Sequence, residues 1–155
     1  MTTERKEDYL KAIDRIVSGK GYAQVKDLSR ELDVGPSSVT GMLRKLTEDG
    51  CINYEKYGGV TLTPKGKEIA DQTREKYGVI RDFLVSLGVD EKIAEDDACK
   101  MEHIIAPETY EQFVRYCAYS KTEKGSRQSA HFKKFCKTGE TEECGCGSAR
   151  YPIDL

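Results

Sequence analysis

The stretch QVKDLSRELDVGPSSVTGMLRKL, residues 24–46, decides the fold of the first part of this chain. Its apolar residues predict a short helix over about 25–32 and a second helix that begins near Pro36. Between them, DVGPSS places a glycine directly before a proline, a pair that suits the end of one helix and the first turn of the next. The buried face of the second helix is expected to contain Val39, Met42, Leu43 and Leu46. Two helices joined by a tight turn indicate a helix-turn-helix.

The segments on either side complete a winged unit. An amphipathic helix is expected over 7–17, where apolar residues recur at three- and four-residue steps. After the second helix of the pair, CINYEKYGGVTLT (51–63) has two β-prone runs around the turn signal YGG and predicts a hairpin. A hairpin in that position is a wing.

The rest of the chain reads as helices and then as a polar tail. A long amphipathic helix starts at Pro64, with an interruption expected near Gly78, and further helices are expected over about 90–105 and 107–119. From Lys121 the composition turns polar, which predicts a linker followed by a cysteine-rich tail. The predicted organisation is therefore mainly α: a winged helix-turn-helix domain (1–63), an all-helical metal-binding and dimerisation domain (64–120), and the linker with its tail (121–155).

Composition narrows the function classes. The chain has 155 residues, 37% of them hydrophobic, and its 25 basic and 27 acidic side chains give a net charge of −2. It therefore has no global positive field, and any DNA-binding surface must concentrate its basic residues on one face. No stretch approaches the roughly 18 apolar residues of a membrane span. A cytoplasmic protein whose six cysteines are thiols or metal ligands is expected.

The helix-turn-helix predicts a DNA-reading surface. The first residues of its second helix reach base edges, and neighbouring side chains contact phosphates. The candidate DNA-binding residues are Lys26, Pro36, Ser37, Ser38, Thr40, Arg44 and Lys56. The alternative is that the serines only cap the helix and that the winged unit is a scaffold or protein-binding module.

A candidate metal site lies in DACKMEHII (97–105). Cys99, Glu102 and His103 stand at i, i+3 and i+4, so a helix presents all three on one face. A thiolate, a carboxylate and an imidazole together suit a first-row transition metal, with a fourth ligand from elsewhere. The alternative is a buried small thiol beside a solvated polar edge.

A second cluster lies in the tail. His131, Cys136, Cys144 and Cys146 could form a tetrahedral zinc site, or the thiolates could hold most of an iron–sulfur cluster. The spacing matches no standard metal motif, so a tail with incidental thiols remains the alternative. Cys51 and Cys117 are expected to be structural.

Residues 21–70, together with EDYLKAI (7–13) and DDACKMEH (96–103), resemble the diphtheria-toxin-repressor family, most closely its manganese-transport-regulator branch. The resemblance covers roughly residues 4–119. It implies a homodimeric, metal-activated repressor of metal-uptake genes that binds operator DNA, with Asp8 as the ligand partner of Cys99, Glu102 and His103.

The chain departs from that family in ways that bear on the metal. Manganese-selective members have a second acidic ligand where this chain has Lys11, and a histidine where it has Tyr77. A binuclear manganese site is therefore not expected. The Cys-x-x-Glu-His run is the one that iron-responsive members share, so Fe(II) is the favoured effector and Mn(II) the alternative. Gly41 replaces a base-contacting side chain, so the operator cannot be copied from a relative.

The sequence thus predicts a metal-dependent transcriptional regulator and not an enzyme. It has no phosphate-binding glycine loop, no nucleophile motif and only two histidines. The competing hypothesis is a thiol-based or iron–sulfur redox sensor that binds DNA and uses the cysteines of the tail.

Overall fold

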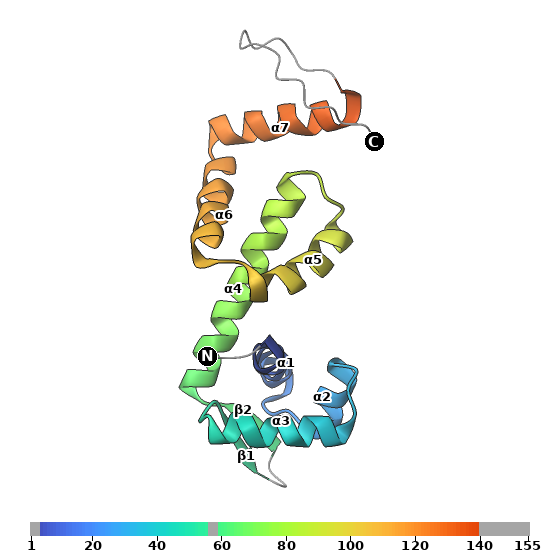
Figure 1. Ribbon diagram of the computed structural model, residues 1–155, viewed down its shortest axis with the longest axis vertical. Coiled ribbons are helices and arrows are strands. Elements are labelled where there is room, and N and C mark those ends of the chain that lie inside the picture. The colour runs from blue at the N-terminus through green and yellow to red at the C-terminus, as the bar shows by residue number, and fades with distance from the viewer. Residues whose placement is uncertain (1–3, 56–58, 140–155) are drawn as a thin grey trace.

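A computed structural model describes residues 4–55 and 59–139 and shows an elongated, mainly helical molecule with one small hairpin (Figure 1). The elements run in the order α1 (Glu4–Lys20), α2 (Val25–Glu31), α3 (Pro36–Glu48), β1 (Ile52–Glu55), β2 (Gly59–Leu62), α4 (Pro64–Ser86), α5 (Glu91–Ile104), α6 (Pro107–Ser120) and α7 (Glu123–Thr138). The predicted winged helix-turn-helix followed by a helical region is confirmed. None of the described helices is long and apolar enough to cross a membrane.

The helix-turn-helix forms as its sequence predicts. Gly35 caps α3 in an extended conformation, and Pro36 occupies the first turn, where its missing N–H is not needed. Val39, Leu43 and Leu46 are fully buried. They pack in one apolar core with residues of α1, α2, the wing and the start of α4, chief among them Leu10, Ile13, Leu28, Ile52, Val60 and Ala70. This core holds α3 with its other face exposed.

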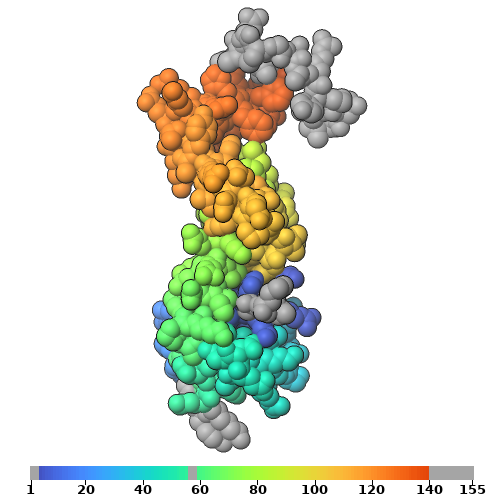
Figure 2. All heavy atoms as spheres, turned by 60° about the vertical axis from the view of Figure 1, so that its left-hand side comes forward, coloured from blue at the N-terminus to red at the C-terminus, as the bar shows by residue number. Residues whose placement is uncertain are grey.

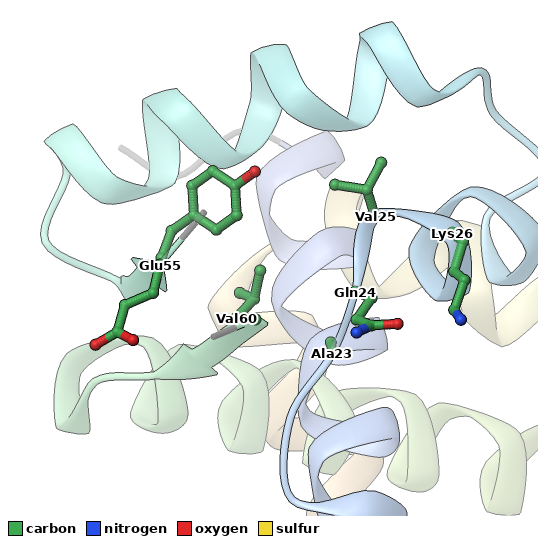
Figure 3. A pocket seen from close by; sticks show the side chains of 8 residues that line it. Ala23, Gln24, Val25, Lys26, Glu55 and Val60 are labelled. Atoms are coloured by element: carbon green, nitrogen blue, oxygen red, sulfur yellow. The ribbon is translucent and has the colours of Figure 1, made fainter. Parts of the chain in front are cut away.

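The wing is an antiparallel pair in which Ile52 faces Leu62 and Glu55 faces Gly59. Ala23, before α2, adds a bridge to it: its N–H donates to Val60 O at 2.9 Å, and Val60 N–H donates to Ala23 O at 2.8 Å. Gly59 has φ +93°, and a Cβ there would lie 2.7 Å from the Tyr22 ring. A hollow of about 270 Å³ lies beside this junction, with Lys26 and Glu55 on opposite sides of it (Figure 3).

Helix α4 connects the winged unit to the helical region (Figure 1). The Thr63 side chain caps it by accepting from Gly66 N–H at 3.2 Å. The interruption expected near Gly78 is absent, because α4 is continuous from Pro64 to Ser86. A single glycine costs a helix only about 1 kcal/mol, and the packing of Ile80, which is fully buried, offsets that cost.

Buried charge ties α1 to α4. Asp14 on α1 is 5% exposed. Its carboxylate accepts from Lys67 Nζ at 2.7 Å and from Arg74 Nη1 at 2.9 Å, both on α4. The cations themselves remain partly solvated, so the pair orients the two helices more than it stabilises them.

Helices α5 and α6 pack along the far half of α4. The rings of Phe83 on α4 and Phe113 on α6 stack with centroids 4.1 Å apart, and Tyr116 meets Phe83 edge-on at 5.2 Å. Cys117 is buried, and its thiol donates to Val79 O at 3.7 Å, as expected of a structural cysteine. Cys51 is likewise buried, at the edge of the wing.

The linker predicted after Lys121 is wrong for residues 123–138, which form α7 at the end of the molecule away from the wing (Figure 2). Local capping explains the helix: the Thr122 side chain accepts from Gly125 N–H at 3.1 Å. A Cβ on Gly125 would lie 2.0 Å from Tyr119 O, so this turn requires glycine. The sequence shows no clear helix signal here, because few residues of α7 are apolar and the apolar face of the helix is narrow.

Candidate metal centre

The candidate centre lies where the first turns of α1 meet the end of α5. Asp8 comes from α1, while Glu102 and His103 come from α5, and donor atoms of the three lie within 4.8 Å of one another. The Asp90 carboxylate starts α5 by accepting from Lys92 N–H at 3.0 Å. Two segments more than ninety residues apart in sequence therefore meet at a group of metal-binding side chains.

The His103 ring is the centre of this group. Its side chain is 3% exposed, and its Nδ1 lies 2.9 Å from Glu7 Oε2. Its Nε2 lies 3.2 Å from Asp8 Oδ1 and 3.4 Å from Glu102 Oε1. Sequence reasoning missed Glu7, whose only signal was its place beside Asp8 in an acidic first turn.

Two buried polar atoms of the centre have no hydrogen-bond partner: Glu102 Oε2 and His103 Nε2. The oxygens near Nε2 are close enough for a hydrogen bond but are not oriented for one. Unsatisfied buried acceptors are rare, and an ion is one of the recognised explanations. A carboxylate and an imidazole nitrogen, with Asp8 alongside, are also ligands that first-row divalent metals prefer. The residues present therefore fit a divalent metal ion.

Cys99 lies at the edge of this group and is exposed. Its Sγ is 3.9 Å from Lys11 Nζ, and it is not among the three residues whose donor atoms all lie within 4.8 Å of one another. The structure thus brings three of the four predicted ligands together and places Cys99 one turn of α5 before His103.

Lys11 joins the group from α1. Its ammonium donates to Glu102 Oε1 and lies 4.0 Å from Asp8 Oδ1. Burial lowers the pKa of Lys11, but the hydrogen bond and charge of Glu102 outweigh it, so the pKa is raised. Burial also raises the pKa of Glu102, against the opposing effect of Lys11. Burial likewise raises the pKa of the Cys99 thiol.

Of the predicted DNA-binding residues that the structure describes, Lys26 lies on α2 and the other five lie on α3. Lys26, Pro36, Ser37, Ser38, Thr40 and Arg44 are all exposed. The Thr40 hydroxyl donates to Pro36 O at 2.9 Å, within α3. Lys56 lies outside the described residues. A Cβ on Gly41 would meet nothing within 4 Å, so this position of α3 is open.

Only two residues of the second predicted centre lie within the part of the chain that the structure describes. His131 and Cys136 lie on α7, and Cys136 is exposed. Five residues of helix separate them by about 140° around the axis, so they do not share a face. Within residues 4–55 and 59–139, they belong to no metal-binding group of three. Cys144 and Cys146 lie outside the described residues.

Two family models match consecutive parts of the chain, from residue 1 to residue 128. Residues 1–60 match the N-terminal DNA-binding domain of iron-dependent repressors. Residues 63–128 match the metal-binding and dimerisation domain of the same repressors. The second match ends within α7, and the tail lies beyond it.

Individual relatives agree with these models. The chain is 45% identical over 103 residues to the HTH-type transcriptional regulator MntR of Bacillus pumilus, covering 66% of this chain and 72% of the relative. The manganese regulator SloR superposes with a TM-score of 0.65 at 27% identity, over 79% of this chain and 57% of that one. ScaR with bound Zn²⁺ superposes with a TM-score of 0.64 at 28% identity, over 76% of this chain and 55% of that one.

Proposed function

Since this chain belongs to the iron-dependent repressor family of metal-dependent, DNA-binding transcriptional regulators, we propose that the centre between α1 and α5 holds the ion that controls its binding to operator DNA. The observation that carries the proposal is the pair of unpartnered buried atoms, Glu102 Oε2 and His103 Nε2. Regulators of this family are not enzymes, and no substrate chemistry is required of the site.

The placement of the ligands gives the mechanism. Asp8 is on α1, whose other face carries Leu10 and Ile13 into the core under α3. Glu102 and His103 are on α5, in the region that matches the dimerisation domain. Side chains from both regions would coordinate a bound divalent ion, whose two positive charges would offset their negative charge. Asp8 and His103 then hold α1 against α5, and this restrains α3 relative to the rest of the molecule. DNA affinity rises to the extent that this arrangement is the DNA-competent one.

Cys99 is proposed as the fourth ligand. One turn before His103 on α5, its Sγ lies 3.9 Å from the Lys11 ammonium, which also donates to Glu102. Fe(II) is the proposed effector because thiolate is a softer ligand than carboxylate and suits iron better than manganese. The similarity to the manganese regulator SloR favours Mn(II) as the alternative.

A direct comparison separates the two metals. Replacing Cys99 by Glu exchanges the thiolate for a carboxylate, so the variant should lose affinity for Fe(II) relative to Mn(II) when both are titrated anaerobically. If the affinities for Fe(II) and Mn(II) changed by the same factor, Cys99 would not be a ligand of the site. Lys100→Glu, which adds a carboxylate at an exposed position of α5 beside Cys99, is the control.

The protein is proposed to act as a homodimer in the cytoplasm and to repress metal-uptake genes. Large apolar side chains are exposed on the helical region, including Ile93 at 55%, Ile104 at 78% and Val114 at 40%. Residues 63–128 match a dimerisation domain, and apolar side chains exposed there are candidates for its interface. Light scattering of the purified chain should give twice the mass of the 17.4 kDa polypeptide.

The comparisons do not favour the redox-sensing hypothesis, since both family matches lie outside the cysteine-rich end of the chain. A zinc ion or cluster held by His131, Cys136, Cys144 and Cys146 stays a prediction. Elemental and acid-labile sulfide analysis of the full chain, compared with a Cys144→Ser, Cys146→Ser double variant, tests it. Metal that is the same in both proteins would exclude the tail as a site.

The central experiment measures DNA binding with and without metal. A target duplex is first selected from random sequences with metal-loaded protein, and its affinity is then measured in Fe(II) and in chelator. His103→Ala should abolish the metal-dependent gain in affinity. Lys100→Ala, at an exposed position of the same helix, is the control and should keep the gain. A His103→Ala protein with the full metal response would overturn the proposal.

A further inference from the structure

The ammonium of Lys11 lies inside the anionic side of the candidate centre. It donates to Glu102 Oε1 and lies 3.9 Å from Cys99 Sγ and 4.0 Å from Asp8 Oδ1. It also lies 5.5 Å from the centroid of the Tyr77 ring, whose face attracts cations. Its side chain is only 27% exposed, so this lysine is held within the group instead of extending into solvent.

The Glu102 carboxylate therefore faces two cation positions. Oε1 accepts from Lys11, whereas Oε2 is buried and has no partner. His103 Nε2, the other unpartnered atom, lies beside the same carboxylate. One position is thus filled by a cation that belongs to the chain, and the other offers unpaired acceptors.

We propose that Lys11 is a resident cation that fills the second of these positions, so that each chain binds a single divalent ion at this centre. This inference rests on the proposed function of the centre. The Lys11 ammonium already occupies the Oε1 side of the Glu102 carboxylate, so a second divalent ion at that position would have to displace it or bind within a few ångströms of a like charge.

Lys11 also sets the affinity of the ion that does bind. Its ammonium repels a divalent ion a few ångströms away and competes with it for Glu102. A neutral side chain of similar length should therefore bind the single ion more tightly. A carboxylate at this position should both remove the resident cation and add a ligand.

The test counts ions directly and does not use DNA binding. The number of Mn(II) ions bound per chain is measured by equilibrium dialysis and elemental analysis. Ions that the natural chain binds but the His103→Ala variant does not are assigned to this centre. We expect one ion for the natural chain and for Lys11→Met, with affinity at least tenfold tighter in Lys11→Met. Lys11→Glu should bind more than one, and its Mn(II) EPR spectrum should show the broadening of two neighbouring ions instead of an isolated six-line signal.

Lys100→Glu is the control, because this lysine lies on α5 beside Cys99 but its side chain is 76% exposed. It should leave the ion count at one. Two ions per natural chain, or unchanged affinity in Lys11→Met, would overturn the role of Lys11 and leave the metal centre intact. A natural chain that loses no Mn(II) on His103→Ala would overturn the proposed function itself. Circular dichroism in Mn(II) confirms that each variant is folded.

Discussion

His103 directs its two ring nitrogens to two different residues of α1: Nδ1 lies 2.9 Å from Glu7 Oε2, and Nε2 lies 3.2 Å from Asp8 Oδ1. If Nδ1 carries the proton and donates to Glu7, Nε2 keeps its lone pair for a metal ion. Carboxylates that orient a metal-binding histidine in this way also make it a better ligand. In this arrangement Glu7 would orient the ring, whereas its neighbour Asp8 would bind the ion.

Replacing Glu7 by Ala should weaken metal binding without removing a ligand. Loss of a residue that orients a metal-binding histidine typically lowers metal affinity about 10- to 100-fold. Glu4→Ala, at an exposed position of the same first turn, is the control. Isothermal titration with Mn(II) measures both. Equal affinities for Glu7→Ala and the natural protein would show that the contact does not orient the ring.

Metal affinity should fall as the pH is lowered. Burial raises the pKa of the Cys99 thiol above its ordinary value, so the metal-free centre keeps a thiol proton that a bound ion must displace. Each proton displaced should weaken apparent affinity by up to about tenfold per pH unit. Titrations between pH 6 and pH 8 in two buffers of different ionisation enthalpy would reveal the proton release. Cys99→Ser should flatten the profile; an unchanged slope would argue against the thiolate as a ligand.

Glu102→Gln should stabilise the metal-free protein while abolishing its response to metal. Because the pKa of Glu102 is raised on folding, its contribution to stability is full below the unfolded pKa and is lost as the pH rises through the folded value. The neutral amide of Glu102→Gln avoids the cost of burying a charge, which should raise the free energy of unfolding by about 1 kcal/mol at neutral pH.

Thermal unfolding in chelator measures that difference. The difference should be smaller near pH 4 than at neutral pH, because the raised pKa of Glu102 favours its uncharged form as the pH falls. Glu95→Gln, at an exposed position of the same helix, is the control and should show no such pH-dependent gain. A Glu102→Gln protein that is less stable by the same amount at both pH values would mean that the Lys11 ion pair outweighs the cost of burial.

Arg44→Ala should weaken DNA binding. Arg44 is exposed on α3, opposite the buried stripe that contains Leu43. If it contacts a phosphate, the plot of log affinity against log salt should become shallower by about 1, and affinity should fall for all sequences alike. If it contacts a base, only binding to the selected duplex should weaken, by about 1–3 kcal/mol. Arg115→Ala on α6 is the control, and equal effects of the two variants would place the DNA elsewhere.

Local patterns were sufficient for most of the secondary structure. Apolar spacing and the Gly35–Pro36 pair predicted α2 and α3, and YGG predicted the wing, because helix periodicity and turn chemistry depend on neighbouring residues. The same local reasoning failed where the signals were weak. It expected a break at Gly78, where packing keeps α4 continuous, and it overlooked α7, where a threonine cap and a close turn outweigh a polar composition.

The sequence by itself determined that Glu102 and His103 share a helix face with Cys99, since spacing on a helix is a local property. Asp8 could be added only through a family resemblance. The tertiary structure alone decided that α1 approaches the end of α5, and this approach brings Glu7 to His103 and Lys11 to Glu102. Contacts between residues about ninety positions apart depend on how helices pack, and no local pattern encodes that packing.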